Sequence, residues 1–170
     1  DVCSSDLAKK SNELTIGQEH IEYANALIHL AKLYVAQERY EKAEYYYDFA
    51  LKIISNKISD THYKYIQVLS EKAILFKQQK RYKEAENIYK KILNTQKKIW
   101  GKKHPRYAQD LVQVAGLYKL AGNYKKSQIF YEKALKIQLN ALGEQHPNYA
   151  ATLNELGQLH HFLGEKDKAF

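Results

Sequence analysis

The sequence predicts an all-α protein, a solenoid built from antiparallel helix pairs. A self-similar unit of 42 residues recurs along the chain, and its copies are marked by His20, His62, His104 and His146. Tyrosine follows three residues after each of these histidines, and leucine follows seven and thirteen residues after it. Agreement at so many offsets over four copies indicates a repeat protein rather than a domain with one central core.

Each unit is predicted to be a helical hairpin, with helix A near 21–36 and helix B near 39–55 in the first copy. The apolar face of helix A, at spacings of three and four, carries Leu27, Leu30, Ala31 and Tyr34. The matching face of helix B carries Tyr40, Ala43, Tyr47, Ala50, Leu51 and Ile54. The turn between them contains Gly122 and Gly164 in later copies, and glycine suits the left-handed residue that ends a helix.

Small residues recur at two fixed positions of the unit. The helix A position holds Ala31, Ala73, Ala115 and Gly157, and the helix B position holds Ala43, Ala85, Ser127 and Ala169. Large residues are expected to face them, namely Tyr47, Tyr89 and Tyr131. Small against large at a fixed register lets two helices approach closely, so we expect most of the fifteen tyrosines to belong to the core.

The repeated His-Pro-x-Tyr-Ala segment is interpreted as the start of helix A. Pro105 and Pro147 suit the first helical turn, where a missing N–H costs nothing, and the preceding histidine lies at or beside the cap. A shared metal site is excluded by geometry. Units are roughly 10 Å apart, and one His per unit cannot meet an ion whose ligands lie at about 2 Å.

These residues resemble the tetratricopeptide repeat family. The motif Large-x2-Leu-(Gly/Ala)-x2-Tyr in helix A, with Ala-x3-Phe/Tyr-x2-Ala in helix B, is similar to that repeat. The 42-residue period and the "GKKHP" and "LGEQHP" connectors resemble the kinesin-light-chain variety, which also occurs in bacterial multi-repeat proteins. The resemblance implies a right-handed superhelix. The chain departs from the motif at Lys72, where the family has Leu, and at His160, where it has Tyr.

The expected organisation is an array that is cut at both ends. Residues 1–7, "DVCSSDL", match no repeat position, resemble the translation of a sequencing adapter and are expected to be a non-native leader. Cys3 lies within them and carries no inference. The other segments are the tail of a preceding helix B at 8–19, repeat units at 20–61, 62–103 and 104–145, and a truncated unit at 146–170.

No motif for catalysis, for a cofactor or for a metal is found in the sequence. His160 and His161 are the one histidine cluster, and adjacent helical residues point in different directions. "GKKHP" lacks the spacing of a phosphate loop, and no nucleophile has a base placed by a motif. We therefore expect a non-enzymatic chain without cofactor. No signal peptide or membrane-spanning segment is seen, and a cytoplasmic location is expected.

The net charge of +8 is concentrated in the second unit. Residues 62–103 hold twelve Lys/Arg and three Asp/Glu. This could be a nucleic-acid footprint or a solvated, lysine-rich surface. The residues favour the solvated surface, because arginines are few and no exposed aromatic is expected for base stacking.

Three functions are compatible with these observations. The leading one is a protein–protein interaction scaffold, in which helix A lines a concave groove for a peptide or helix. The alternative is the regulatory or sensor array of a larger enzyme, such as a CHAT-type protease or a signalling kinase. The third is nucleic-acid binding through the basic second unit.

The groove residues follow from the positions that line the inner face in the resembling family. They are Asn25, Lys32, Gln67, Ser70, Lys77, Gln109, Lys119, Asn154, Gln158 and His161. Lys77 and Lys119 are equivalent residues in adjacent units, which favours an acidic ligand if they act together. Two solvated lysines without a ligand are the equally simple interpretation.

Overall fold

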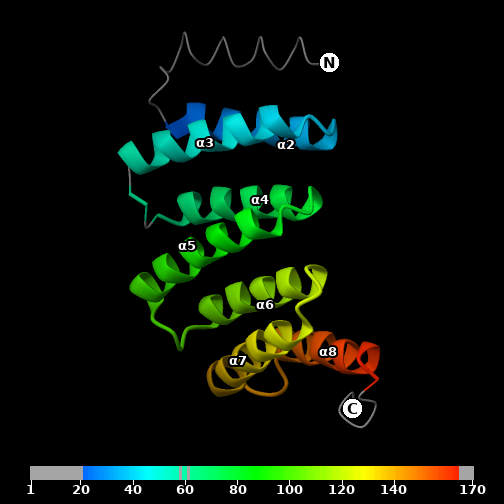
Figure 1. Cartoon of the computed structure of the whole chain (residues 1–170). Coiled ribbons are helices and arrows are strands. Elements are labelled where there is room, and N and C mark those ends of the chain that lie inside the picture. The colour runs from blue at the N-terminus through cyan, green and yellow to red at the C-terminus, as the bar shows by residue number, and fades with distance from the viewer. Residues whose placement is uncertain (1–20, 58, 61, 165–170) are drawn as a thin grey trace. The chain divides into compact units, whose positions relative to one another are not determined.

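A computed structural model describes residues 21–57, 59–60 and 62–164 (Figure 1). Within these residues the chain is all α-helical and has no strand. Its helices are α2 (Ile21–Ala36), α3 (Tyr40–Lys57), α4 (Tyr63–Gln78), α5 (Tyr82–Trp100), α6 (Pro105–Leu120), α7 (Tyr124–Leu142) and α8 (Pro147–Phe162). The leader expected at 1–7, the helix tail expected at 8–19 and Ala169 lie outside the described residues.

The chain forms two compact units, which divide after Gln79. The first unit holds α2, α3 and α4; α2 packs on α3, and α3 packs on α4. Its core contains the predicted faces of both hairpin helices. The side chains that are at most 1% exposed there include Tyr23, Leu27, Tyr34, Tyr47 and Ile54. The first predicted hairpin is therefore confirmed, with helix boundaries within two residues of those expected.

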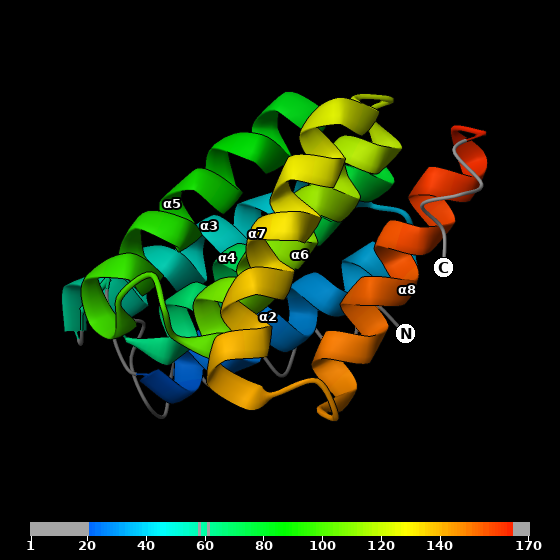
Figure 2. The ribbon, with the colours of Figure 1, turned by 90° about the horizontal axis from the view of Figure 1, so that it is seen from below.

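The second unit holds α5 to α8. Helices α6 and α7 lie side by side, α5 packs on α6, and α8 packs on α7 (Figures 1 and 2). One cluster of its core joins Ala115, Tyr131, Leu156 and Leu159. A second cluster joins Ala108, Leu111 and Ala134.

The positions predicted to be small are buried in the first three copies, whereas Gly157 of the fourth copy is only half-buried. Ala31, Ala73, Ala115, Ala43, Ala85 and Ser127 are all fully buried. Ser127 is the one polar residue of this set. Its buried hydroxyl has a hydrogen-bond partner, because it donates to the backbone oxygen of Ala115 at 2.8 Å. The predicted large partners are buried too: Tyr47, Tyr89 and Tyr131 are at most 2% exposed.

Among the described residues, three helices start with a histidine cap. The Nδ1 atoms of His62, His104 and His146 accept hydrogen bonds from backbone N–H groups two residues onward, at 3.3, 3.2 and 3.1 Å. Each cap satisfies one N–H that the helix itself leaves without an acceptor. Pro105 and Pro147 are the first residues of α6 and α8, so the predicted role of the His-Pro segment is confirmed.

The turns after helix A place one residue in the left-handed region. Gly122 and Gly164 adopt φ of 75° there, as predicted. The same place in the first two copies is taken by Glu38 and Lys80, both with φ of 58°. A side chain makes this conformation costly, so these two turns are strained where the glycine turns are not.

A buried polar pair lies between α5 and α6. The side chain of Gln96 hydrogen-bonds Asp110, yet Gln96 Oε1 and Asp110 Oδ2 are buried without a hydrogen-bond partner among the described residues. Burial raises the pKa of Asp110 to about 6, and the Gln96 hydrogen bond opposes the shift. Burial, with the nearby Asp110 charge, raises the pKa of Tyr89 to about 12.

The structure accounts for one departure from the motif and corrects one expectation about side chains. Lys72 is 9% exposed at a position where the motif has leucine, and its ammonium group lies 2.6 Å from Asp48 Oδ1. The expectation that no aromatic residue is exposed is wrong, because Tyr45, Tyr63 and Trp100 are 61%, 59% and 46% exposed. Helical spacing identifies the buried face of a helix, but an aromatic residue outside that face remains exposed.

Candidate functional site

The groove residues predicted in the first unit are mostly engaged with a neighbouring helix. Asn25 Oδ1 accepts a hydrogen bond from Lys64 Nζ at 3.2 Å, which joins α2 to α4. Lys32 Nζ lies 2.6 Å from Glu71 Oε1, also between α2 and α4. Asn25 and Lys32 therefore hold α2 against α4. A ligand could bind them only by sharing or displacing Lys64 and Glu71.

The remaining predicted groove residues of this unit lie on α4. Ser70 donates its hydroxyl hydrogen to the Ile66 backbone oxygen of the same helix at 3.0 Å. Gln67 is exposed, and Lys77 is half-buried. Burial lowers the pKa of Lys77. No described carboxylate forms an ion pair with Lys77, so its ammonium group is available within this unit.

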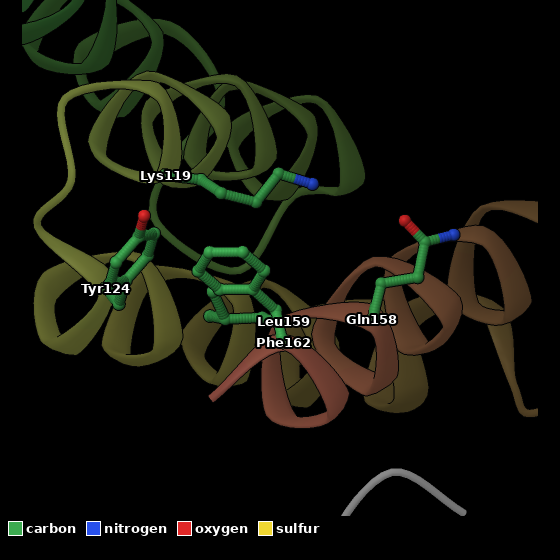
Figure 3. Close-up of a pocket in the computed structure, with 5 residues that line it drawn as sticks. All are labelled: Lys119, Tyr124, Gln158, Leu159 and Phe162. Atoms are coloured by element: carbon green, nitrogen blue, oxygen red, sulfur yellow. The ribbon is translucent and has the colours of Figure 1, made fainter. Parts of the chain in front are cut away.

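The second unit brings two predicted groove residues into one pocket. It has a volume of about 330 Å³ and is lined by Lys119, Tyr124, Gln158, Leu159 and Phe162. Figure 3 shows the Lys119 side chain extending over the pocket toward the side of Gln158, with the Phe162 ring below it and Tyr124 on the opposite side. Helices α6, α7 and α8 each contribute to the lining.

The pocket walls are mainly apolar, with polar groups at the edge. The Tyr124 and Phe162 rings lie 5.2 Å apart between centroids, and Phe162 is 69% exposed. Leu159 is 1% exposed and forms the floor from the core side. An apolar wall with a few fixed polar groups is the usual composition of a ligand pocket.

The charge beside the pocket is balanced. Lys119 Nζ lies 2.7 Å from Glu155 Oε2, and the Tyr131 hydroxyl donates to the same oxygen at 3.2 Å. The Lys119 hydrogen bond lowers the pKa of Glu155, and burial together with the Glu155 charge raises the pKa of Tyr131. Lys119 is therefore paired, and its attraction for an acidic ligand is weaker than that of a lone ammonium group.

The other predicted groove residues of the second unit are exposed but do not line this pocket. They are Gln109 on α6, with Asn154 and His161 on α8. His160 is 5% exposed and His161 is exposed, so the two adjacent rings point to different surroundings, as expected. No group of three or more His, Cys, Asp or Glu that could hold a metal ion is found among the described residues.

Several residues of this site were not identified by the sequence reasoning. Glu71 and Glu155 occupy the same repeat position, nine residues after the cap histidine, and each pairs with a lysine on the preceding helix A. Their lysine partners do not share a repeat position, because Lys32 lies twelve and Lys119 fifteen residues after the histidine of its unit, so the recurring glutamate was the signal in the sequence. Tyr124 and Phe162 gave no such signal, because their place in the pocket depends on how α8 is set against α6 and α7.

Comparisons with known proteins agree on the repeat. A sequence model described as the tetratricopeptide repeat matches residues 22–98, 76–138 and 107–170. No curated protein sequence matches the chain significantly. In the part of the chain that is described, no helix is both long and apolar enough to cross a membrane.

Solved structures with a similar fold include BtubC (BKLC) from P. vanneervenii, at 27% identity and a TM-score of 0.73. That match covers 88% of this chain but only 60% of BtubC. Repeats of a kinesin light chain from Podosopora anserina match at 20% identity and a TM-score of 0.82, covering 99% of this chain and 79% of theirs. A signal transduction ATPase with a tetratricopeptide repeat sensor, from Pyrococcus horikoshii, matches at 25% identity and a TM-score of 0.77. That match covers 95% of this chain and 24% of the ATPase.

Proposed function

This chain belongs to the tetratricopeptide repeat family, and from that premise we propose that it is a protein–protein interaction scaffold that binds a partner peptide or helix on the exposed residues of its A helices. The pocket between α6, α7 and α8 carries this proposal, because Lys119 and Gln158 meet apolar Leu159 and Phe162 there. The pocket takes one apolar side chain of the partner. The Gln158 amide and Lys119 are at its edge, where they can bond the partner's backbone or a carboxylate.

An acidic partner remains part of the proposal. Lys77 has no carboxylate partner among the described residues, and Lys119 can exchange Glu155 for a carboxylate of the ligand. The fitting ligand is an extended or helical segment with an apolar anchor and acidic neighbours. A cytoplasmic location stays a prediction.

The test starts with peptides selected on the immobilised chain from a random library. Phe162→Asp places a charge in the pocket and should weaken binding of the selected peptides at least tenfold, measured by isothermal titration calorimetry. Leu120→Asp is the matched control, because Leu120 holds the same repeat position and is 54% exposed outside the pocket. Equal loss in both variants, or loss in neither, would refute the pocket as the binding site.

A second function is favoured by one specific observation, the likeness to a signal transduction ATPase that has a tetratricopeptide repeat sensor. We propose as the alternative that this array is the regulatory or sensor part of a larger enzyme of the protease or signalling-kinase class. Long-read sequencing of the gene decides between the two, since this alternative requires a catalytic domain encoded in the same reading frame.

A further inference from the structure

The corner between α5 and α6 is strongly basic. Residues 97–106, "KKIWGKKHPR", contain five Lys or Arg and no Asp or Glu. The cations Lys97, Lys98, Lys102, Lys103 and Arg106 are all exposed. None of them forms an ion pair with a described carboxylate, whereas Lys32, Lys72 and Lys119 all do. The corner therefore presents an uncompensated positive charge.

Apolar side chains are exposed in the middle of these cations. Trp100 is 46% exposed and Ile99 is 36% exposed. The Trp100 ring is held in place from the following loop and helix: it stacks on His104, with centroids 4.8 Å apart, and the Arg106 guanidinium lies 5.2 Å from its centroid. A large ring is thus oriented at the surface rather than packed in the core.

The fold does not require this composition. The equivalent corner between α7 and α8, residues 139–148, has no Lys or Arg and contains Glu144. Leu142 stands there in place of Trp100, and Glu144 and Gln145 stand in place of Lys102 and Lys103. Both corners nevertheless have a capping histidine and a helix that starts at proline. The basic, aromatic corner is therefore an addition to a turn that forms without it.

We propose that this corner, Lys97 to Arg106, docks on an anionic lipid surface. Tryptophan is suited to the boundary between water and hydrocarbon, because its ring is apolar and its N–H needs a polar partner. Lysines beside a membrane are attracted by phosphate headgroups of acidic lipids. Ile99 and Trp100 enter the headgroup boundary, and the lysines on both sides of them bind the headgroups.

A single-stranded nucleic acid fits the same charge less well. Such sites use successive aromatic rings on which neighbouring bases stack. This corner has one tryptophan, already stacked on His104, and its second exposed apolar residue is the aliphatic Ile99. Ile99 has a role at a lipid surface and none in base stacking.

The chain carries its own reporter for this proposal, because Trp100 is its only tryptophan. The whole chain is mixed with vesicles of phosphatidylcholine, with and without phosphatidylglycerol, at an ionic strength of about 0.1 M. We expect the chain to co-float with the acidic vesicles only, with a blue shift of Trp100 emission and quenching by brominated lipid. A uridine oligonucleotide is tested in parallel.

Variants separate docking at this corner from general attraction. Lys102→Glu with Lys103→Glu should lower partitioning onto acidic vesicles at least tenfold, and Trp100→Ala should also weaken it. Lys125→Glu with Lys136→Glu changes the charge equally on α7, at two exposed lysines, and should leave partitioning within about twofold of the parent. Absence of binding to acidic vesicles, unshifted Trp100 emission, equal effects of both lysine pairs, or binding to the oligonucleotide alone would each overturn the proposal.

Discussion

The ammonium nitrogen of Lys72 lies 2.6 Å from Oδ1 and 2.7 Å from Oδ2 of Asp48, and this contact joins α4 to α3. The same nitrogen lies 3.6 Å from Glu44 Oε1 and 5.3 Å from the centroid of the Phe76 ring. A lysine at a leucine position is thus tolerated, because its charge reaches carboxylates at the edge of the core while its methylenes remain buried.

Removal of Asp48 should expose the dependence of Lys72 on that partner. We expect Asp48→Ala to lower the free energy of unfolding by about 1–2 kcal/mol, between the values for exposed and buried pairs, because the Asp48 side chain is 56% exposed. In a Lys72→Leu background the same change should cost almost nothing. Urea denaturation of the four proteins completes the double-mutant cycle. An identical cost in both backgrounds would show that Asp48 acts independently of Lys72.

The buried carboxyl of Asp110 should make stability depend on pH. Its pKa is raised from 3.8 to about 6, so the folded chain binds this proton more tightly than the unfolded chain. The contribution of Asp110 to the free energy of unfolding therefore falls as the pH rises from about 4 to about 6, by up to about 3 kcal/mol.

Asp110→Asn should remove that slope and stabilise the chain at pH 7. The measurement is the difference in unfolding free energy between the variant and the parent across this pH range, with Glu144→Gln as an exposed control. A constant difference from pH 4 to pH 7 would contradict the raised pKa. Protonation also supplies a hydroxyl donor at Asp110, whose Oδ2 atom is buried without a hydrogen-bond partner in the described residues.

The histidine caps should contribute to stability through one hydrogen bond each. His146→Ala removes the acceptor for the Asn148 N–H, and we expect a loss of about 0.5–2 kcal/mol. His146→Asn keeps an acceptor at the cap and should recover most of the loss. Thermal unfolding monitored by circular dichroism provides the comparison. The cap assignment is wrong if the alanine and asparagine variants have the same melting temperature, well below that of the parent.

The small position in α6 should not accept a larger side chain. Ala115 is fully buried against Tyr131 and Leu156, so Ala115→Leu should lower the free energy of unfolding by about 1–3 kcal/mol. Lys136→Leu adds an exposed leucine on α7 and serves as the control. If both variants unfold at the same urea concentration, the core around Ala115 has room for a leucine and the position is not tightly packed.

The fold could be predicted from the sequence because it repeats four times. Helical spacing identified the buried faces, and the proline, glycine and histidine positions identified the helix ends. The lengths of the B helices were predicted less well, because α3 continues to Lys57 and no residue near its end signals a stop. The family and the all-α class follow from local patterns, which are independent of the exact placement of one helix on another.

The candidate site could be predicted only in part, because it depends on contacts between helices. Sequence position placed Lys119 and Gln158 on A helices, and the pocket contains both. The pairing of Lys119 with Glu155 depends on the axial offset between α6 and α8, which periodicity does not give. The exposure of Trp100 also depends on contacts between helices and could not be predicted from repeat position. Leu142 holds the same position in the next unit and is half-buried.

The left-handed residues after helix A differ along the chain, and this difference affects how the chain opens. Glu38 and Lys80 hold a conformation that Gly122 adopts without strain. Native proteins open locally where stability is lowest, and amide hydrogens exchange first at such places. The amides around Glu38 and Lys80 should therefore exchange with deuterium sooner than those around Gly122, which gives the repeats a graded order of opening even though their helices look alike.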